Sequence, residues 1–489
     1  MTVFDVIAYH ARTWPEAPAL ITDGMTISYE MLIGEAMDRA GRLAALGIRP
    51  GALVGIALKD GPEFLIAALA AARIDAIAAP LDWRAPAAEI ERLIGALELT
   101  VALIEPREGV SHPAAITLDD LRRTLARPID SAVAVSQDSG FRIKITSGST
   151  GSTKAIITTH RQQLHDWMRW LFDFGVVRHD CYLSATPLCY AAGFSRCVRH
   201  LLTGASVAMF PPLFSPEELV EAAGRMKATN VFAVPTIARQ LLGVARGETP
   251  LLPNLHIIEL AGAAFTAEEK LAALRKISPN TYDCYGASGY GQISILRPRE
   301  MAERPETVGR ATFGAEIEIV DEAGQPLPCG DVGRLRVRGP GLLNELPATA
   351  GQSATEFFDG GWYYPGDLAR LDEAGFITLV GRSANLIKRG GASISSEEVE
   401  AVITRHPAVR EAAVFGRPSA DLGQEVVAVI VLRRAIGATE LERHCRAQLA
   451  PHKVPVAFHA VETLPRNTAG KIARAKLPEL TAGKGRAVV

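Results

Sequence analysis

Residues 145–154 form the segment whose residue types point most clearly to chemistry. They read Ile-Thr-Ser-Gly-Ser-Thr-Gly-Ser-Thr-Lys, so every residue after the isoleucine is a glycine, a hydroxyl residue or lysine. Glycines let a backbone approach a ligand and adopt left-handed angles, and successive N–H groups can then point at one anion. The hydroxyl groups add donors, and the lysine adds a positive charge. The segment therefore predicts a phosphate-binding loop with contacts from Thr146, Ser147, Gly148, Ser149, Thr150, Gly151 and Lys154.

Two other interpretations of this loop fit less well. A flexible linker seldom lies directly between two apolar strand-like runs, whereas this loop lies between residues 141–145 and 155–157. A Walker-type nucleotide loop needs a glycine immediately before its lysine and a serine or threonine after it. Here Thr153 precedes Lys154 and Ala155 follows it. The loop alone therefore indicates a phosphate group without identifying the molecule that carries it.

Short apolar runs alternate with helical patterns up to about residue 380. A helix is predicted over residues 29–46, because Gly47 follows as a natural C-terminal cap. Strands at 53–58 and 76–81 flank a helix at 62–72, and this βαβ unit predicts a parallel sheet. Further short strands are predicted at residues 206–210, 231–234, 256–260 and 281–284. The pattern predicts a doubly wound α/β core.

The pattern changes after residue 315. Residues 316–320 and 334–338 alternate charged and apolar side chains, which predicts antiparallel strands with one solvated face in a small β-barrel-like subdomain. A compact α+β domain of about a hundred residues is predicted after Gly391. Its helices are expected near 397–405 and 440–449, and its strands near 412–415 and 425–432. The predicted domains are residues 1–382 and 383–489.

Composition excludes several classes of partner. The 489 residues are 48% hydrophobic and 22% charged, and a formal net charge of −2 gives no general attraction to nucleic acid or anionic membranes. The first residues lack the pattern of a signal peptide, and the longest apolar run, residues 64–72, is too short to span a bilayer. The six cysteines form no CxxC pair, so we expect buried thiols in a reducing, cytoplasmic setting.

Four more segments decide which family the sequence resembles. They are Tyr285-Gly286-Ala287-Ser288, residues 362–367, Gly381-Arg382 with residues 386–391, and residues 465–472. In this order and spacing, together with the loop, they resemble the adenylate-forming superfamily of acyl- and aryl-CoA synthetases, peptide-synthetase adenylation domains and luciferases. The resemblance covers about residues 3 to 478. It implies that MgATP and a carboxylic acid react to an acyl-adenylate and pyrophosphate, after which a thiol, usually that of coenzyme A or a carrier protein, displaces AMP.

The resemblance also implies roles for single residues in the first step. Cations must neutralise the charge that develops there, and Lys471 is similar to the lysine that bridges the carboxylate and the α-phosphate. Asp367 and Arg382 would hold the ribose, Tyr285 would stack on adenine, and the loop would hold pyrophosphate. The remaining nucleotide contacts would come from Gly262, Ala263, Ala264, Gly286 and Ser288. The alternatives are a solvated Lys471, a turn-forming Asp367, a surface Arg382 and a core Tyr285.

For the second step, the resemblance implies a movement of the C-terminal domain about a hinge just after Arg382. One orientation would bring Lys471 to the nucleotide, and the other would bring Lys388, which is therefore a candidate for thioester formation. The alternative for Lys388 and its neighbour Arg389 is a solvated charge pair in a loop. Such alternation acts as a gate and can set turnover.

Some positions depart from the family pattern. Gly289 stands where the family usually has a glutamate that helps to hold magnesium, so the metal ligands remain unidentified. Ala384 replaces the usual charged hinge residue, and Pro365 and Thr153 are milder changes. Tyr190 replaces a frequent histidine and is either a wall of the acid pocket or a core aromatic residue.

We expect the pocket for the carboxylic acid to be lined mostly by small or apolar residues without charge. Its predicted lining is Tyr190, Ala191, Ala192, Gly193, Val234, Ala261 and Ala287. Such a pocket suits an uncharged aryl or medium aliphatic acid and disfavours amino acids, whose ammonium group needs a carboxylate partner.

The predicted activity is an AMP-forming acyl- or aryl-CoA ligase acting on a small carboxylic acid, in a monomer or homodimer. One alternative is an adenylation enzyme that loads a separate carrier protein. Another is a degenerate nucleotide-binding homologue, which Gly289 and Ala384 make conceivable. Retention of four residues favours an active enzyme: Lys154, Asp367, Arg382 and Lys471.

Overall fold

The computed structural model divides the chain into two compact units. The first comprises Met1–Glu316 and Val337–Tyr363, and the second comprises Ile317–Arg336 and Tyr364–Val489. The residues that the structure describes are 1–129, 135–147, 153–211, 214–287, 289–340, 342, 357–382, 385–389, 392–419, 421–466 and 472–481.

One sheet of the first unit carries the predicted phosphate loop. Its strands, in spatial order β6-β5-β3-β4-β7-β8, are parallel except for the antiparallel final pair. Inward-facing residues alternate along each strand: Ile56 packs with one buried cluster and Ala57 with another on the opposite face. The strands are β3 (Leu53–Ala57), β4 (Ile77–Pro80), β5 (Val101–Ile104), β6 (Ala115–Thr117), β7 (Gly140–Ser147) and β8 (Thr153–Thr159).

A second sheet of the first unit has the spatial order β15-β14-β13-β12-β11-β9-β10-β1-β2 among the described residues. The strands from β13 to β1 are parallel to their neighbours, and the edges are antiparallel. Its strands are β1 (Pro18–Thr22), β2 (Met25–Ser28), β9 (Cys181–Ser184), β10 (Ser206–Met209), β11 (Asn230–Ala233), β12 (Ile257–Ala261), β13 (Thr281–Ala287), β14 (Gly291–Leu296) and β15 (Arg310–Ala311).

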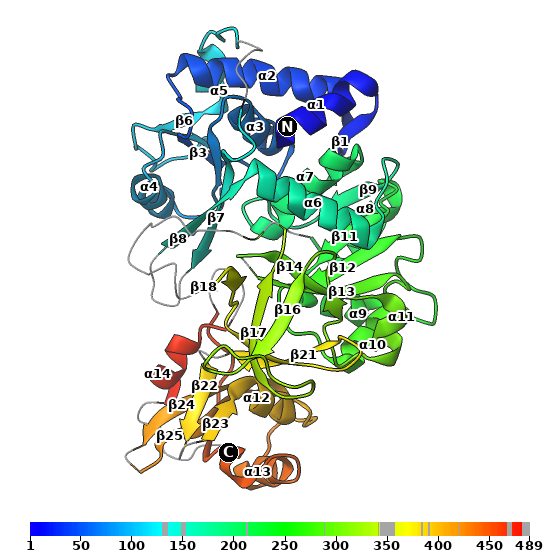
Figure 1. Ribbon diagram of the computed structural model, residues 1–489, viewed down its shortest axis with the longest axis vertical. Coiled ribbons are helices and arrows are strands. Elements are labelled where there is room, and N and C mark those ends of the chain that lie inside the picture. Colours follow the sequence, from blue (N-terminus) through cyan, green and yellow to red (C-terminus); the bar gives the residue numbers. More distant parts are fainter. Residues whose placement is uncertain are drawn as a thin grey trace. The chain divides into compact units, whose positions relative to one another are not determined.

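Helices cover both sheets, as expected for a doubly wound fold. Helices α6 and α7 lie side by side (Figure 1), and the Trp167 indole on α6 donates to Thr203 Oγ1 on α7 at 2.9 Å. The helices are α1 (Val3–Thr13), α2 (Tyr29–Ala45), α3 (Pro62–Arg73), α4 (Ala87–Ala96), α5 (Leu118–Arg123), α6 (His160–Phe174), α7 (Ala191–Thr203), α8 (Pro216–Arg225), α9 (Pro235–Val244), α10 (Ala267–Lys276) and α11 (Pro298–Glu303).

Antiparallel strands follow in the chain. In the first unit, β18 (Phe358–Asp359) pairs with β19 (Trp362–Tyr363), and Val337 at the end of β17 (Gly333–Arg338) pairs with Tyr363. In the second unit, the start of β17 pairs with β20 (Asp367–Leu371), and β20 pairs with β21 (Ile377–Arg382). Strand β16 (Glu316–Val320) pairs with β17.

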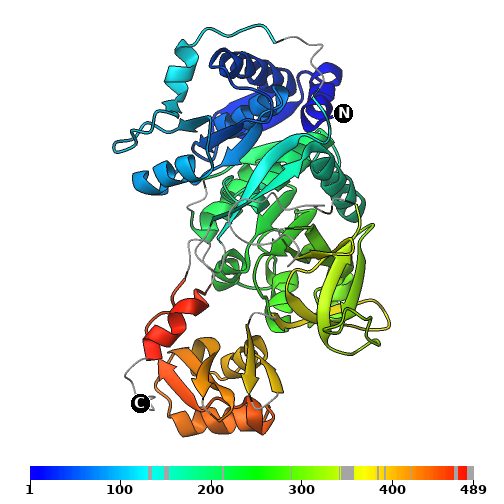
Figure 2. The same cartoon turned by 60° about the vertical axis from the view of Figure 1, so that its left-hand side comes forward.

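The rest of the second unit is an α+β sheet with helices on both faces (Figure 2). Alternate residues of its central strands explain this arrangement: Val414 packs in the cluster that contains α12 and α13, and Ala413 packs in the cluster that contains α14. The elements are β22 (Leu386–Arg389), β23 (Ala392–Ser395), α12 (Ser396–Thr404), β24 (Val409–Ser419), β25 (Gly423–Leu432), α13 (Ala438–Arg446), β26 (Ala457–Ala460) and α14 (Leu477–Thr481).

The structure confirms the predicted parallel α/β core and the α+β C-terminal part. The boundary after Arg382 stays a prediction, because it concerns a hinge, whereas the compact units divide the chain elsewhere. The expectation that the cysteines are buried is wrong for two of them: Cys189 is partly exposed and Cys329, in the turn before β17, is exposed. No helix in the described ranges combines the length and apolar character needed to cross a bilayer.

Candidate active site

The predicted phosphate loop connects the two strands of a hairpin. Strands β7 and β8 pair in antiparallel register, with Thr146 opposite Lys154 and Ser147 opposite Thr153. This pairing confirms that the segment lies between strands and is not an interdomain linker. The loop residues Gly148, Ser149, Thr150 and Gly151 lie outside the described part of the chain.

The remaining candidate residues of the first unit gather at one edge of its larger sheet. Strands β9, β11, β12 and β13 are parallel neighbours, so their carboxyl ends lie at the same edge. Tyr190 and Val234 follow the ends of β9 and β11, Ala261 is the last residue of β12, and Tyr285 lies close to the end of β13. The carboxyl edge of a parallel sheet is the usual ligand site in open α/β folds. Tertiary structure therefore unites residues that are about a hundred positions apart in the sequence.

Glycines shape the part of this edge proposed for adenine. Gly262 has φ of +101°, a conformation that favours glycine, and a Cβ added there would lie 3.8 Å from Val234 Cγ1. Ala263 and Ala264 are exposed beside it. A Cβ on Gly286 would lie only 2.5 Å from the Gly291 carbonyl oxygen, so the chain can approach there only as glycine.

Tyr285 and Tyr190 are not core aromatic residues. Tyr285 is half-buried on β13, and Tyr190 is 37% exposed immediately before α7. The core alternative for Tyr190 is therefore wrong. Ala191 and Ala192 are exposed and partly exposed, whereas Gly193 is buried, and its added Cβ would lie 2.4 Å from the Pro187 carbonyl oxygen. The neighbouring Ala287 is partly exposed, and Ser288 lies outside the described residues.

Sequence reasoning missed a charged pair beside Tyr190. The Arg84 side chain donates to Asp82 at 2.7 Å and to the sulfur of Cys189 at 3.9 Å. Asp60 accepts from the Leu188 backbone N–H at 2.5 Å, and burial raises the pKa of this carboxyl. No short sequence motif indicates these contacts, because residues 60 and 82–84 follow β3 and β4, which belong to the sheet that carries the β7–β8 hairpin.

The two predicted ribose-binding residues face each other in the second unit. Asp367 begins β20 and Arg382 ends β21, and the two are direct partners in the antiparallel register. The Arg382 Nε lies 2.9 Å from the Asp367 carboxylate, with the Asp367 side chain 6% and the Arg382 side chain 55% exposed. A buried carboxylate oriented by a cation is a suitable acceptor for hydroxyl groups. We call these residues the Asp367–Arg382 pair.

The two candidate lysines of the second unit differ in what is known of their surroundings. Lys388 lies on β22 rather than in a loop, its side chain is exposed, and its backbone N–H donates to Gln424 at 2.7 Å. Lys471 lies outside the described residues, as does the hinge residue Ala384. Arg466 and Ile472, which flank the segment of Lys471, form a β-bridge.

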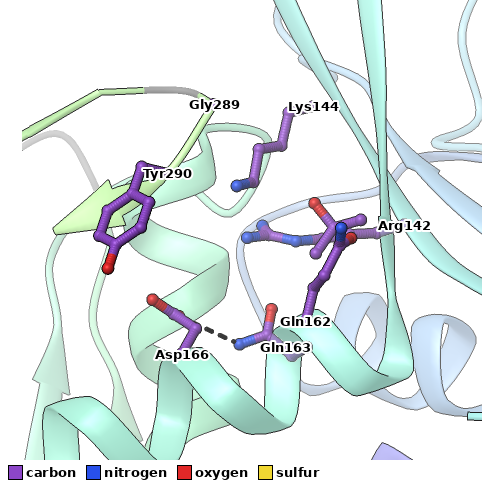
Figure 3. A pocket seen from close by; sticks show the side chains of 8 residues that line it. Arg142, Lys144, Gln162, Gln163, Asp166, Gly289 and Tyr290 are labelled. Atoms are coloured by element: carbon purple, nitrogen blue, oxygen red, sulfur yellow. Dashed lines mark hydrogen bonds between the residues drawn. The ribbon is translucent and has the colours of Figure 1, made fainter. Parts of the chain in front are cut away.

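A pocket beneath the β7–β8 hairpin is lined by charged residues that sequence reasoning did not single out. Arg142 and Lys144 come from β7, Asp166 from α6, and Tyr290 from the turn after β13. Figure 3 shows the Lys144 amine and the Arg142 guanidinium directed into one space that Asp166 and Tyr290 border. The signal that could have revealed this pocket is the alternation of Arg142 and Lys144 in an otherwise apolar strand.

These groups perturb one another strongly. Burial lowers the pKa of Arg142 to about 10. Burial and the charge of Arg142 lower the pKa of Lys144 to about 7. Burial alone would raise the pKa of Asp166, but Arg199, Arg169 and Lys144 together bring it down to about 2. Clustered shifts of this size are typical of functional sites, although buried ion pairs also produce them.

Gly289, at the rim of the same pocket, has no space for a side chain. A Cβ added there would lie 2.4 Å from Cε2 of Tyr363. In the described part of the chain, no cluster of three or more His, Cys, Asp or Glu residues could hold a metal ion. Magnesium prefers carboxylate, phosphate and water oxygens, and the carboxylate of Asp166 already accepts from Arg199 at 2.7 and 2.9 Å. The protein groups at this pocket therefore do not fit a magnesium site.

Two family models match the chain. The model of the AMP-binding enzyme matches residues 7–345, and that of the AMP-binding enzyme C-terminal domain matches residues 398–471. The 2-succinylbenzoate–CoA ligase of Bacillus subtilis (strain 168) is 28% identical over 480 residues, which cover 97% of each chain.

Solved structures of a related protein show the same fold. The o-succinylbenzoate CoA synthetase of Bacillus subtilis, with the acyl-adenylate intermediate OSB-AMP, matches with a TM-score of 0.89 and 27% identity over 98% of each chain. The same protein with ATP and magnesium ion matches with a TM-score of 0.89 and 26% identity, covering 97% of this chain and 99% of that one. Since the first family model spans more than half of its 489 residues, this chain belongs to the AMP-binding enzyme family.

Proposed function

We propose that this protein is an AMP-forming acid–CoA ligase that converts a small carboxylic acid, ATP and coenzyme A into an acyl-CoA, AMP and pyrophosphate. The observation that carries the proposal is the convergence of Tyr190, Val234, Ala261 and Tyr285 at one sheet edge in a chain of this family. Relatives that match almost the whole chain are named as CoA ligases, and one is seen with an acyl-adenylate. These matches favour coenzyme A as the acceptor.

The first half-reaction is assigned to residues of both units. The carboxylate of the acid attacks the α-phosphate of ATP, an acyl–O–P bond forms, and the bond to the pyrophosphate oxygen breaks. Lys471 would stabilise the charge that develops on the carboxylate and phosphate oxygens. The Asp367–Arg382 pair would hold the ribose, and the residues beside Gly262 and Tyr285 would hold adenine. The hairpin loop from Thr146 to Lys154 would take the leaving pyrophosphate.

In the second half-reaction, the sulfur of the thiol attacks the acyl carbon and a C–S bond forms. The bond from that carbon to the AMP oxygen breaks, and the thiol proton is released. Lys388, whose side chain is exposed on β22, is the candidate residue for this step. Magnesium, when bound, would neutralise charge on the phosphates of ATP. The protein groups at the pocket beside Gly289 do not fit a magnesium site.

The acid is proposed to be aryl or medium aliphatic. The predicted lining, from Tyr190 to Gly193 with Val234, Ala261 and Ala287, offers small apolar groups at the sheet edge. Among the charged groups near Tyr190, Arg84 and Asp82 neutralise each other, and burial raises the pKa of the third, the Asp60 carboxyl. An uncharged acyl chain fits such a surface better than one that carries an ammonium group.

One assay tests the activity. The protein is incubated with ATP, magnesium and a panel of aryl and aliphatic acids, and pyrophosphate, AMP and thioester are measured with and without coenzyme A. We expect thioester and AMP that depend on coenzyme A. Adenylate that turns over only with a phosphopantetheinylated carrier protein would instead support the carrier-loading alternative. Absence of pyrophosphate release across the panel would support a degenerate homologue and overturn the proposal.

A pair of variants tests the division between half-reactions. Lys471→Ala should reduce adenylate formation by about a thousandfold or more, because a preorganised cation contributes a few kcal/mol to the transition state. It should leave thioester formation from a supplied acyl-adenylate nearly unchanged. Lys388→Ala should show the opposite pattern. Equal loss of both half-reactions in both variants would contradict the assignment.

A further inference from the structure

The pocket under the β7–β8 hairpin belongs to a larger buried group that we call the cationic cluster: Arg142, Lys144, Arg169 and Arg199, with Asp166 between them. Arg142 is 2% exposed, and Arg169 and Arg199 are each 4% exposed. Lys144 is partly exposed and lines the pocket together with Arg142. The members come from β7, α6 and α7, so packing of distant segments assembles them.

Positive charge exceeds negative charge in this cluster. Asp166 accepts from Arg199 at 2.7 and 2.9 Å and lies 3.8 Å from Arg169. The other carboxylates that interact with these cations have closer partners of their own, Glu259 with Arg196 at 2.6 Å and Asp173 with Arg297 at 2.9 Å. Asp166 is thus the one described carboxylate shared among the cluster's cations. Buried charge without a counter-charge is costly, which favours a bound anion.

Several guanidinium nitrogens of the cluster have no hydrogen-bond acceptor among the described residues. They are Nε of Arg142, Nε and Nη1 of Arg169, and Nη1 of Arg199. Arg142 uses another nitrogen to donate to Ser195 at 2.5 Å, so its side chain is held in place while Nε remains available. Figure 3 shows this guanidinium directed toward the pocket. A fixed, buried donor without an acceptor favours an anionic ligand, and among these three arginines Arg142 is the one that lines the pocket.

The position of the pocket identifies the class of anion. Lys144 lies on β7 two residues before Thr146, where the phosphate-type loop begins, and Gly289 follows the Tyr285–Ser288 motif. The pocket thus lies where two motifs assigned to the nucleotide meet. It is narrow, with room for little more than one water-sized group, so a single phosphate oxygen fits it and a base or sugar does not. Tyr363 fills the space of any side chain at position 289, so no carboxylate enters from there to bind a metal ion.

We propose that Lys144, backed by Arg142 and the rest of the cationic cluster, forms a subsite for the terminal phosphate of pyrophosphate and supplies charge that a protein-held metal ion would otherwise supply. This inference rests on the proposed function, in which pyrophosphate is the leaving group. It makes Lys144 a ligand-binding residue of the reaction and predicts that pyrophosphate binds to the protein without magnesium.

Titration calorimetry of inorganic pyrophosphate on the full-length protein, with a chelator present, tests the subsite. We expect binding by the unmodified protein, at least tenfold weaker binding by Lys144→Met, and largely retained binding by Lys144→Arg. Lys276→Met, which removes an exposed lysine on α10, is the matched control and should bind like the unmodified protein. Thermal unfolding of each variant shows that a loss of binding is not a loss of folding.

Proton uptake gives a sharper readout. At pH 8, before pyrophosphate binds, the Lys144 amine is mostly neutral, because its pKa is about 7, and a bound phosphate group would favour its protonated form. Comparing binding heats in two buffers of different ionisation enthalpy should therefore show uptake approaching one proton, absent in Lys144→Met. Failure of the unmodified protein to bind pyrophosphate, or equal affinity and uptake in Lys144→Met, would overturn the proposal.

The same variants separate this inference from the proposed function. A protein that makes thioester normally in both the unmodified and Lys144→Met forms, with equal pyrophosphate binding, retains the ligase assignment and loses the subsite. A protein that binds pyrophosphate through Lys144 and makes neither adenylate nor thioester keeps the subsite as an anion site and loses the ligase assignment.

Discussion

The two units differ in how the charges of their buried polar residues are balanced. In the second unit, the Asp367–Arg382 pair matches one buried carboxylate with one half-exposed guanidinium at 2.9 Å. In the first unit, the cationic cluster places three arginines and Lys144 around Asp166 as the shared carboxylate. A matched ion pair is stable without a ligand, whereas a buried cluster with excess positive charge is stabilised most when an anion binds. The comparison is consistent with the two proposed roles, in which the first unit binds an anion and the second binds neutral hydroxyl groups.

The largest expected effect comes from removing the shared carboxylate. Asp166→Asn leaves buried arginines without a counter-charge, so we expect the free energy of unfolding to fall by about 3–5 kcal/mol. Chemical denaturation measures this change. The control is Asp138→Asn at the exposed pair with Arg161, where the Asp138 side chain is 65% exposed and the loss should stay under about 1 kcal/mol. Similar losses of unfolding free energy in both variants would show that Asp166 stabilises the protein no more than a carboxylate in a surface ion pair does.

The stability of the protein at acid pH should depend on the same carboxylate, that of Asp166. The pKa of Asp166 in the folded protein, about 2, lies below its ordinary value of 3.8. Its stabilisation is therefore complete above about pH 4 and is lost as the pH falls toward 2. Unfolding curves of Asp166→Asn should lack this part of the acid dependence.

A second test addresses the absence of a carboxylate at the rim of the cluster. Gly289→Ala places a methyl group against the Tyr363 ring, and such overpacking should cost about 1–3 kcal/mol of stability. Combining it with Tyr363→Leu should recover part of the loss, which a double-mutant cycle measures as coupling. Gly95→Ala on α4, where a Cβ meets nothing within 4 Å, is the control. Strict additivity of the two changes would show that Tyr363 does not exclude a side chain at position 289.

A third test uses alkaline pH. The pKa of Lys144 in the folded protein, about 7, lies below the ordinary 10.5, so the unfolded chain binds more protons between these values. Stability should therefore rise with pH from 7 toward 10.5, by at most about 1.4 kcal/mol per pH unit for one proton. Lys144→Met should remove this contribution, and Lys276→Met should keep it. An identical pH dependence in Lys144→Met would place the titration on another group.

The smallest effect is expected in the second unit. Arg382→Ala should change the free energy of unfolding by less than about 1 kcal/mol, because its side chain is 55% exposed. AMP binding should nevertheless weaken by about tenfold, since in the proposed site the guanidinium orients the carboxylate that accepts from the ribose. Arg370→Ala, an exposed arginine on β20, should alter neither quantity. Equal AMP affinity in all three proteins would remove Arg382 from the nucleotide site.

The sequence by itself determined the local elements and the order of the motifs. The βαβ unit from β3 to β4, the strands around the phosphate-type loop and the alternating strands β16 and β17 were predictable, because hydrophobic periodicity and glycine placement are local properties. The family resemblance likewise needed only the order of short segments. It also led to Asp367 and Arg382, which the structure pairs across β20 and β21.

Only the tertiary structure decided which charges share a buried site. Arg142 and Lys144 are ordinary strand residues until α6 and α7 bring Asp166 and Arg199 against them, and Gly289 is an ordinary glycine until Tyr363 covers it. The physical reason is that the cost of a buried charge depends on its neighbours in space, whereas periodicity reports neighbours along the chain. The excess of positive charge under the hairpin therefore exists only in the folded protein.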